Sequence, residues 1–146
     1  MRYEVAMENI LPKMKNIEGV VAIFLKGSIA RGENDAYSDL DLYVMLEKEV
    51  YVEDVYNDII DSLEQYQKLL YKELVEIICP QIVGVYENML HVDCYIVHEN
   101  KYPLTDDIKV LYDSKKILEN YVKQDLILTK EMFQDSALDS CWFIFQ

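Results

Sequence analysis

The stretch FLKGSIARGENDAYSDLDLYVML, residues 24–46, holds a short polar loop between two apolar segments. The first segment, GVVAIFLKG over residues 19–27, combines β-branched and aromatic residues between two glycines, which is typical of a buried strand. The second segment, DLDLYVML over residues 39–46, predicts another strand. The loop between them suits a turn followed by one helical turn. The sequence therefore predicts a sheet that includes these two strands.

Further strands and several helices are predicted around this unit. Apolar residues at helical spacing over 3–17 and 51–70 predict two helices, with Pro12 kinking or ending the first. Strands are expected at ELVEIIC, QIVGVY, MLHVDCYIV and IKVLYD, with a hairpin turn at Glu87-Asn88. The predicted fold class is α/β (α+β), with a mixed sheet of four to five strands flanked by helices.

The last part of the chain predicts two more helices, one over 114–124 and one from about residue 129. We therefore divide the chain into a domain over residues 1–128 and a C-terminal helix over residues 129–146. The chain ends on the apolar residues CWFIFQ, and large aromatics left exposed form a sticky patch. We expect this end to be covered by the domain itself, by a second copy of the chain or by a helical domain absent from this sequence.

The composition excludes several classes of protein. The chain has 146 residues, 51% hydrophobic and 28% charged, which suits one globular domain with its own core. No apolar run reaches the roughly 18–20 residues of a membrane span, and no secretory signal is recognisable, so a cytoplasmic location is expected. Three cysteines at wide spacing and two histidines argue against a zinc site.

The net charge of −13, from 14 basic and 27 acidic residues, bears on the partners of the protein. An acidic surface repels the phosphate backbone, so general nucleic-acid binding is not expected. The same surface attracts metal ions, polyamine-like molecules or a basic protein. The alternative is that acidity serves solubility alone, and composition by itself favours this second interpretation.

Asp39 and Asp41 are the first candidate functional residues. Side chains two positions apart on a strand share a face, so these carboxylates point the same way while Leu40, Leu42 and Val44 face the core. Two carboxylates this close repel each other unless a proton or a cation lies between them. Magnesium, a hard ion that takes oxygen ligands from carboxylates and substrate phosphates, fits this pattern. The alternative is a pair of ordinary turn acids at a strand entrance.

A Gly-Ser pair ends the first strand, with ten residues between Ser28 and Asp39. Gly27 has no side chain, so a phosphate group can approach the backbone closely. Ser28 lies where a short helix would begin and offers its hydroxyl and neighbouring amides to an anion, and Arg31 adds positive charge about a turn later. A phosphate cradle that faces a magnesium-binding pair is the apparatus of phosphoryl or nucleotidyl transfer.

This pattern resembles the signature of the DNA polymerase β-like nucleotidyltransferases, which is Gly-Ser, ten residues and Asp-x-Asp. The extended form is also present, as GSIARGE and SDLDL. The resemblance implies the fold of that superfamily, with residues 1–128 as the catalytic domain. It also implies a nucleoside triphosphate co-substrate, with ATP as the default, and two Mg²⁺ ions as cofactor. The implied metal ligands and catalytic residues include Asp39 and Asp41, and the implied nucleotide-binding residues are Gly27, Ser28 and Arg31.

Members of this superfamily usually carry a third carboxylate on a later strand, and Asp93 in MLHVDCYIV is the natural candidate. Strand alternation places His91, Asp93 and Tyr95 on one face, with Val92, Cys94 and Ile96 facing inward. The resemblance implies that Asp93 completes the metal shell, serves as the general base, or both. We assign Glu33, Glu47 and Glu76 to solvated surface. Packing is the default interpretation of the twelve tyrosines, and Tyr37 and Tyr95 are the two candidates for stacking on a base or sugar.

Two branches of the superfamily fit the sequence. LVEIICPQIV, MLHVDCYIVHE and VLYDSKKILENYV resemble the catalytic domain of antibiotic-modifying nucleotidyltransferases, whose acceptors are aminoglycosides or lincosamides. The length and GSIARGE also suit a minimal nucleotidyltransferase that acts as an antitoxin on a HEPN-type toxin partner. A binding-only remnant is the third alternative, although the intact aspartates weigh against it. Attraction by the acidic surface favours a polycationic aminoglycoside among the small acceptors.

Overall fold

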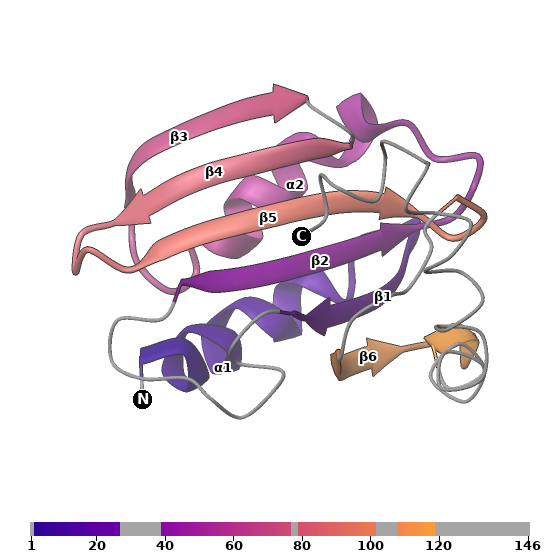
Figure 1. Cartoon of the computed structure of the whole chain (residues 1–146), viewed down its shortest axis with the longest axis horizontal. Coiled ribbons are helices and arrows are strands. Elements are labelled where there is room, and N and C mark those ends of the chain that lie inside the picture. Colours follow the sequence, from indigo (N-terminus) through magenta and orange to yellow (C-terminus); the bar gives the residue numbers. More distant parts are fainter. Residues whose placement is uncertain (1, 27–38, 77–78, 102–107, 119–146) are drawn as a thin grey trace, which may run out of the picture.

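The computed structural model describes residues 2–26, 39–76, 79–101 and 108–118. These ranges contain two helices on one face of a single sheet, as Figure 1 shows. The helices are α1 (Arg2–Met14) and α2 (Val52–Leu63). The strands are β1 (Val20–Leu25), β2 (Leu40–Leu46), β3 (Leu69–Glu76), β4 (Pro80–Tyr86), β5 (His91–His98) and β6 (Lys109–Asp113).

The sheet is mixed, with the strand order β3-β4-β5-β2-β1-β6. β2 and β5 run parallel, whereas every other neighbouring pair of these strands is antiparallel. The predicted class and the mixed sheet are confirmed. The predicted number of four to five strands is wrong, because all six strand-like segments join one sheet, including the short β6, which pairs with the outer edge of β1.

Both predicted N-terminal helices are present but shorter than their apolar periodicity indicated. α1 ends at Met14, with Pro12 inside its last turn and the amide of Asn16 donating to the Pro12 carbonyl at 2.8 Å. α2 ends at Leu63, so the predicted helix over 51–70 is too long. Its last part is a turn and the start of β3, where Leu70 is 63% exposed. Accidental helical spacing across a helix–strand junction explains this error.

The sheet is buried on both faces near its centre. One face packs against α1 and α2, and the strand alternation predicted for β2 and β5 is confirmed there. Its fully buried strand residues are Leu40, Leu42, Val44, Val92, Cys94 and Ile96. The other face carries a second cluster of buried residues, formed by Val21, Ala22, Phe24, Tyr43, Met45, Val97 and Leu118. The carboxylates considered below lie at the edge of this second cluster.

The predicted helix over 129–146, the domain boundary at residue 128 and most of the predicted helix over 114–124 lie outside the described residues. Cys79 and Cys94 are free thiols. Neither α1 nor α2 is long and apolar enough to cross a membrane.

The buried hydroxyl of Tyr86 connects the end of β4 to the end of α2. Tyr86 at the end of β4 is fully buried and donates to the carbonyl of Leu63 at 2.8 Å. Tyr86→Phe removes this hydrogen bond and leaves the Leu63 carbonyl only the longer one from the Tyr66 N–H at 3.4 Å, so we expect the free energy of unfolding to fall by about 1–2 kcal/mol, measured by urea denaturation. Tyr51→Phe is the matched control, because Tyr51 is 71% exposed, and it should change stability by less than about 0.5 kcal/mol. Equal losses in the two variants would contradict this account.

Candidate active site

Acidic side chains meet at the amino ends of the two parallel strands. Asp41 on β2 and Asp93 on β5 are direct Cα partners in the parallel ladder. Asp39 immediately precedes β2 and is exposed. The structure therefore brings the three candidate carboxylates to one place on the sheet face opposite α1 and α2.

The pKa of Asp41 shows how crowded these charges are. Burial, followed by the negative charges of Asp93 and Asp39, raises the pKa of the Asp41 carboxyl from 3.8 to about 6, against the opposing effect of Lys26. Burial also raises the pKa of Asp93, and Asp39 adds to this shift. The amide of Gln81 donates to Asp93 Oδ1 at 3.2 Å and, with His91, works in the opposite direction. A cation bound between these carboxylates would relieve their repulsion.

The chemistry of these residues fits magnesium. All three side chains offer hard oxygen donors, and Mg²⁺ is commonly held by one or two carboxylates together with waters and substrate phosphates. Within the described part of the chain, no three His, Cys, Asp or Glu side chains already form a cluster that could hold a metal ion by themselves. An ion held by these carboxylates would need further ligands, such as waters or phosphate oxygens.

An aromatic row lies next to the carboxylates on the same face of the sheet. Phe24, Tyr43 and Tyr95 are paired across β1, β2 and β5, and each aromatic residue on β2 and β5 is two positions from an aspartate. The rings of Phe24 and Tyr43 stack with centroids 5.0 Å apart, and those of Tyr43 and Tyr95 with centroids 4.4 Å apart. Burial, with the charges of Asp93 and Asp41, raises the pKa of Tyr95, so its hydroxyl remains a neutral hydrogen-bond donor.

This packing limits the role suggested for Tyr95. One face of its ring is covered by Tyr43, so a base or sugar would have to stack on the remaining exposed part. The stacking role of Tyr95 stays a prediction. The aromatic row provides a rigid support beside the carboxylates.

The sequence-based reasoning missed two residues of this site. Lys26 is only 4% exposed, its backbone N–H donates to the carbonyl of Asp41 at 3.1 Å, and its Nζ lies 5.2 Å from the centre of the Tyr43 ring. The only sequence signal was a charged residue within the apolar run before Gly27. Gln81 had no local signal, because its contact with Asp93 depends on the register between β4 and β5.

The remaining candidate residues are distributed as follows. Gly27, Ser28, Arg31, Glu33 and Tyr37 lie outside the described residues. The roles of Gly27, Ser28 and Arg31 are taken up below as proposals, and those of Glu33 and Tyr37 stay predictions. Glu47 and Glu76 are exposed, as expected for solvated surface.

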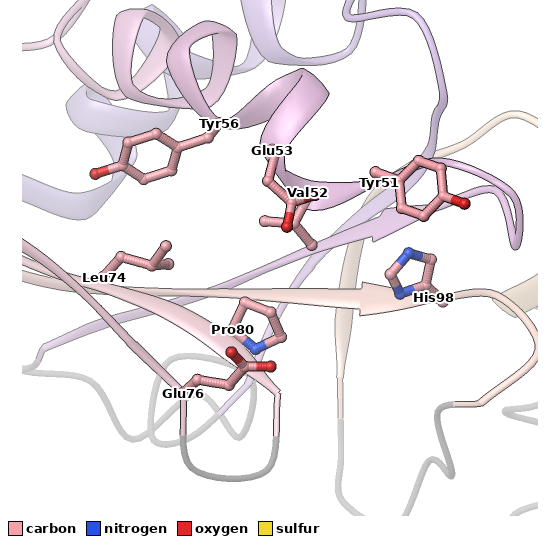
Figure 2. A pocket seen from close by; sticks show the side chains of 8 residues that line it. All are labelled: Tyr51, Val52, Glu53, Tyr56, Leu74, Glu76, Pro80 and His98. Atoms are coloured by element: carbon pink, nitrogen blue, oxygen red, sulfur yellow. The ribbon is translucent and has the colours of Figure 1, made fainter.

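A separate pocket of about 500 Å³ lies on the helix-covered face, beside α2 and the carboxyl end of β5. Figure 2 shows side chains at the start of α2 facing side chains from the ends of β3, β4 and β5 across it. Its lining includes His98, whose Nε2 lies 2.7 Å from the carbonyl oxygen of Val50. His98 is an odd number of positions from Asp93 on β5 and lies on the opposite face. The pocket and the carboxylates are therefore separated by the sheet.

Comparisons with known proteins identify the family and the fold. A family model described as a nucleotidyltransferase domain matches residues 7–123. No curated protein matches the chain at a significant level. Among solved structures, one of Cid1, studied for its RNA terminal uridylyl transferase activity, aligns with a TM-score of 0.51 and 15% identity over 89% of this chain. A second, of the Cid1 poly(U) polymerase with MgGTP bound, aligns with a TM-score of 0.51 and 16% identity over 90% of this chain. The chain spans 35% and 36% of these two chains, and the likeness concerns the fold.

The raised pKa of Asp41 predicts a specific pH dependence of stability. Because the folded protein holds this proton more tightly than the unfolded chain does, the metal-free protein should lose stability as the pH rises from about 4 to above 6. Asp41→Asn removes the charge, so its thermal midpoint should exceed that of the wild type at pH 8 and approach it near pH 4.5. Thermal denaturation in a chelator tests this. Asp58→Asn, at an exposed position of α2, should not change the pH profile in this way.

Proposed function

Because this chain belongs to the family of nucleotidyltransferase domains, we propose that it transfers a nucleoside monophosphate from a nucleoside triphosphate to an acceptor hydroxyl, with Mg²⁺ as cofactor. One observation carries this proposal. The parallel pairing of β2 with β5 sets Asp41 beside Asp93, with Asp39 close enough to raise the pKa of both. Crowded, half-buried carboxylates are unfavourable in a metal-free protein, and such pairs are frequent at functional sites.

Asp39, Asp41 and Asp93 are the residues that would hold Mg²⁺. Two bound Mg²⁺ ions would neutralise charge on the phosphate oxygens of the nucleotide. Gly27, Ser28 and Arg31 would bind the triphosphate, through the close backbone approach that glycine permits and through hydroxyl and guanidinium donors. These three assignments come from the Gly-Ser pattern in the sequence.

The acceptor oxygen attacks the α-phosphorus, and the bond from this phosphorus to the oxygen that bridges it to the β-phosphate breaks, which releases pyrophosphate. The acceptor hydroxyl loses its proton in the same step. Asp93 would receive it, and the rise in its pKa from burial and Asp39 supports this role, because it makes the carboxylate a better base. The Gln81 amide at 3.2 Å fixes one oxygen of Asp93 and leaves the other for the proton.

The charge of the protein narrows the acceptor class. A net charge of −13 opposes the approach of RNA, which is the acceptor of terminal uridylyl transferases. It favours a cationic small molecule, and we propose an aminoglycoside-like antibiotic as the acceptor, ahead of a lincosamide. Modification of a toxin protein is the competing possibility, and the experiment below separates the two.

The test is to follow label from each α-³²P-labelled nucleoside triphosphate with Mg²⁺ and three acceptor pools. These pools are aminoglycosides, lincosamides and a cell lysate. Label on an antibiotic supports the small-molecule proposal, whereas label on a protein band supports the toxin-modifying alternative. Absence of transfer with any acceptor and any nucleotide would overturn the proposed activity of this chain.

Substitution of the carboxylates gives the second test of the activity. Asp39→Asn and Asp41→Asn should each lower the Mg²⁺-dependent transfer rate by at least about 100-fold, because each removes a metal ligand. Asp93→Asn should lower kcat more than it weakens nucleotide binding, because it removes the proposed base. Circular dichroism serves as the control for folding. A double Asp39→Asn, Asp41→Asn variant that transfers at the normal rate would refute the assignment.

Salt dependence tests the acceptor class. If the acidic surface attracts a polycationic acceptor, kcat/KM for an aminoglycoside should fall several-fold between about 50 and 300 mM KCl, because salt screens long-range attraction. The value for a lincosamide acceptor should change much less. Initial rates at subsaturating acceptor measure this, and salt-independent aminoglycoside kinetics would contradict electrostatic capture.

A further inference from the structure

Lys26 is a buried cation at the end of β1. It follows the last residue of β1 and is 4% exposed, whereas most lysines remain in water. Its Nζ lies over the ring of Tyr43, 5.2 Å from the ring centre. Burial of an ammonium group is unfavourable unless nearby groups compensate for the lost water. The face of an aromatic ring supplies part of that compensation.

The charge of Asp41 also contributes to that compensation. The N–H of Lys26 donates to the Asp41 carbonyl, which continues the β1–β2 ladder beyond the Leu25–Leu42 pair. Lys26 and Asp41 are therefore opposite each other on adjacent strands, and their side chains share one face of the sheet. The positive charge of Lys26 counteracts the rise in the pKa of Asp41, which shows that the two charges interact.

We propose that Lys26 is a positioning residue that acts as an internal counter-cation for the carboxylates while no metal ion is bound, and that Mg²⁺ takes over this role on binding. This inference rests on the proposed function, since it concerns the same carboxylates. Nothing in the nucleotidyl transfer derived above uses Lys26. Its ammonium lies over the Tyr43 ring, on the sheet face that carries Asp41, so it would partly neutralise the site without filling it.

The proposal has an unusual consequence for metal affinity. Lys26 and Mg²⁺ are both positive and act on the same aspartates, so the presence of one disfavours the other. Lys26→Met keeps an unbranched apolar stem, one atom shorter, and removes the charged ammonium group. The metal-free variant should therefore be less stable than the wild type, yet it should bind Mg²⁺ more tightly. A merely structural role would weaken metal binding when the residue is replaced.

The experiment measures Mg²⁺ affinity by isothermal titration calorimetry at pH 8.5, well above the pKa of about 6 for Asp41. Lys26→Met should bind Mg²⁺ about three- to tenfold more tightly than the wild type, the size expected for removing one nearby charge. Lys26→Arg keeps the charge and should bind as the wild type does. Lys26→Gln gives a second uncharged variant should Met not be tolerated.

Two controls separate this effect from general charge effects. Lys115 carries the same charge but pairs with Glu47 and Glu99 at the carboxyl ends of β2 and β5, at 3.5 and 3.3 Å. Lys115→Met should leave Mg²⁺ affinity unchanged. Asp41→Asn should abolish the heat of Mg²⁺ binding at the carboxylate site, so comparison with the wild type identifies that heat.

The outcomes are distinguishable. Unchanged or weaker Mg²⁺ binding in both Lys26→Met and Lys26→Gln, with normal binding in the wild type, would overturn the role of Lys26 and leave the proposed function intact. Absence of any Asp41-dependent Mg²⁺ binding in the wild type would overturn both. A measurement on the wild-type protein does not depend on whether a variant folds. The ¹³Cε signal of Lys26, assigned with Lys26→Arg, should move when Mg²⁺ saturates the site, and a static signal would count against the proposal.

Discussion

The parallel pairing of β2 with β5 is the constraint on which the rest of the structure depends. In a sheet whose other described pairs are antiparallel, this one junction brings two strand starts to the same edge. It sets Asp41 beside Asp93 and, two positions on, Tyr43 beside Tyr95. A slip of the register by one residue would turn Asp93 toward the helices and Cys94 toward the carboxylates. The buried alternation of Val92, Cys94 and Ile96 prevents that slip.

The segment that connects β2 to β5 makes their parallel pairing possible. A parallel pair cannot be joined by a hairpin, and the segment between β2 and β5 supplies α2 and the β3–β4 hairpin. α2 covers one face of the sheet. The β3–β4 hairpin extends the sheet beyond β5, where the side chain of Gln81 on β4 donates to Asp93. The same connection that makes the pairing possible therefore also orients one of the carboxylates.

The two faces of the central strands differ in the side chains that they carry. The helix-covered face is apolar along β2 and along β5 as far as Ile96, and supplies most of the core. The other face changes from carboxylates at the strand starts to stacked aromatics and then to Met45 and Val97. The charged groups are thus set against a rigid apolar support, and burial by that support contributes the largest part of the rise in the pKa of Asp41.

Much of this arrangement could be predicted from the sequence, because the deciding signals are local. Strict alternation in LDLYVML and HVDCYIVH fixed which side chains face the core, and the Gly-Ser and Asp-x-Asp spacing indicated the family that the comparison then showed. The errors came where local pattern and tertiary context differ. Helical spacing continued from α2 across a turn into β3, so the end of α2 was misplaced.

Other features depend on strand register, which the sequence does not contain. The contact of Gln81 with Asp93 requires the pairing of β4 with β5, and the place of Lys26 beside Asp41 requires the antiparallel alignment of β1 with β2. Neither residue stands out by type, because a glutamine on a strand and a lysine at a strand end are ordinary surface choices. Their importance appears only when the sheet is assembled.

The same parallel pairing has a kinetic consequence for how the protein matures. Asp41 and Asp93 are about fifty positions apart in the chain, and contacts between such distant segments are slow to form during folding. Helices and hairpins such as α2 and β3–β4 can form from neighbouring residues, whereas the carboxylate site requires β5 to dock against β2. A partly folded chain in which β5 has not yet docked contains every residue of the site, but these residues are not close together in space. Metal binding would therefore report completed folding, and a newly made chain would acquire its chemistry in one late step.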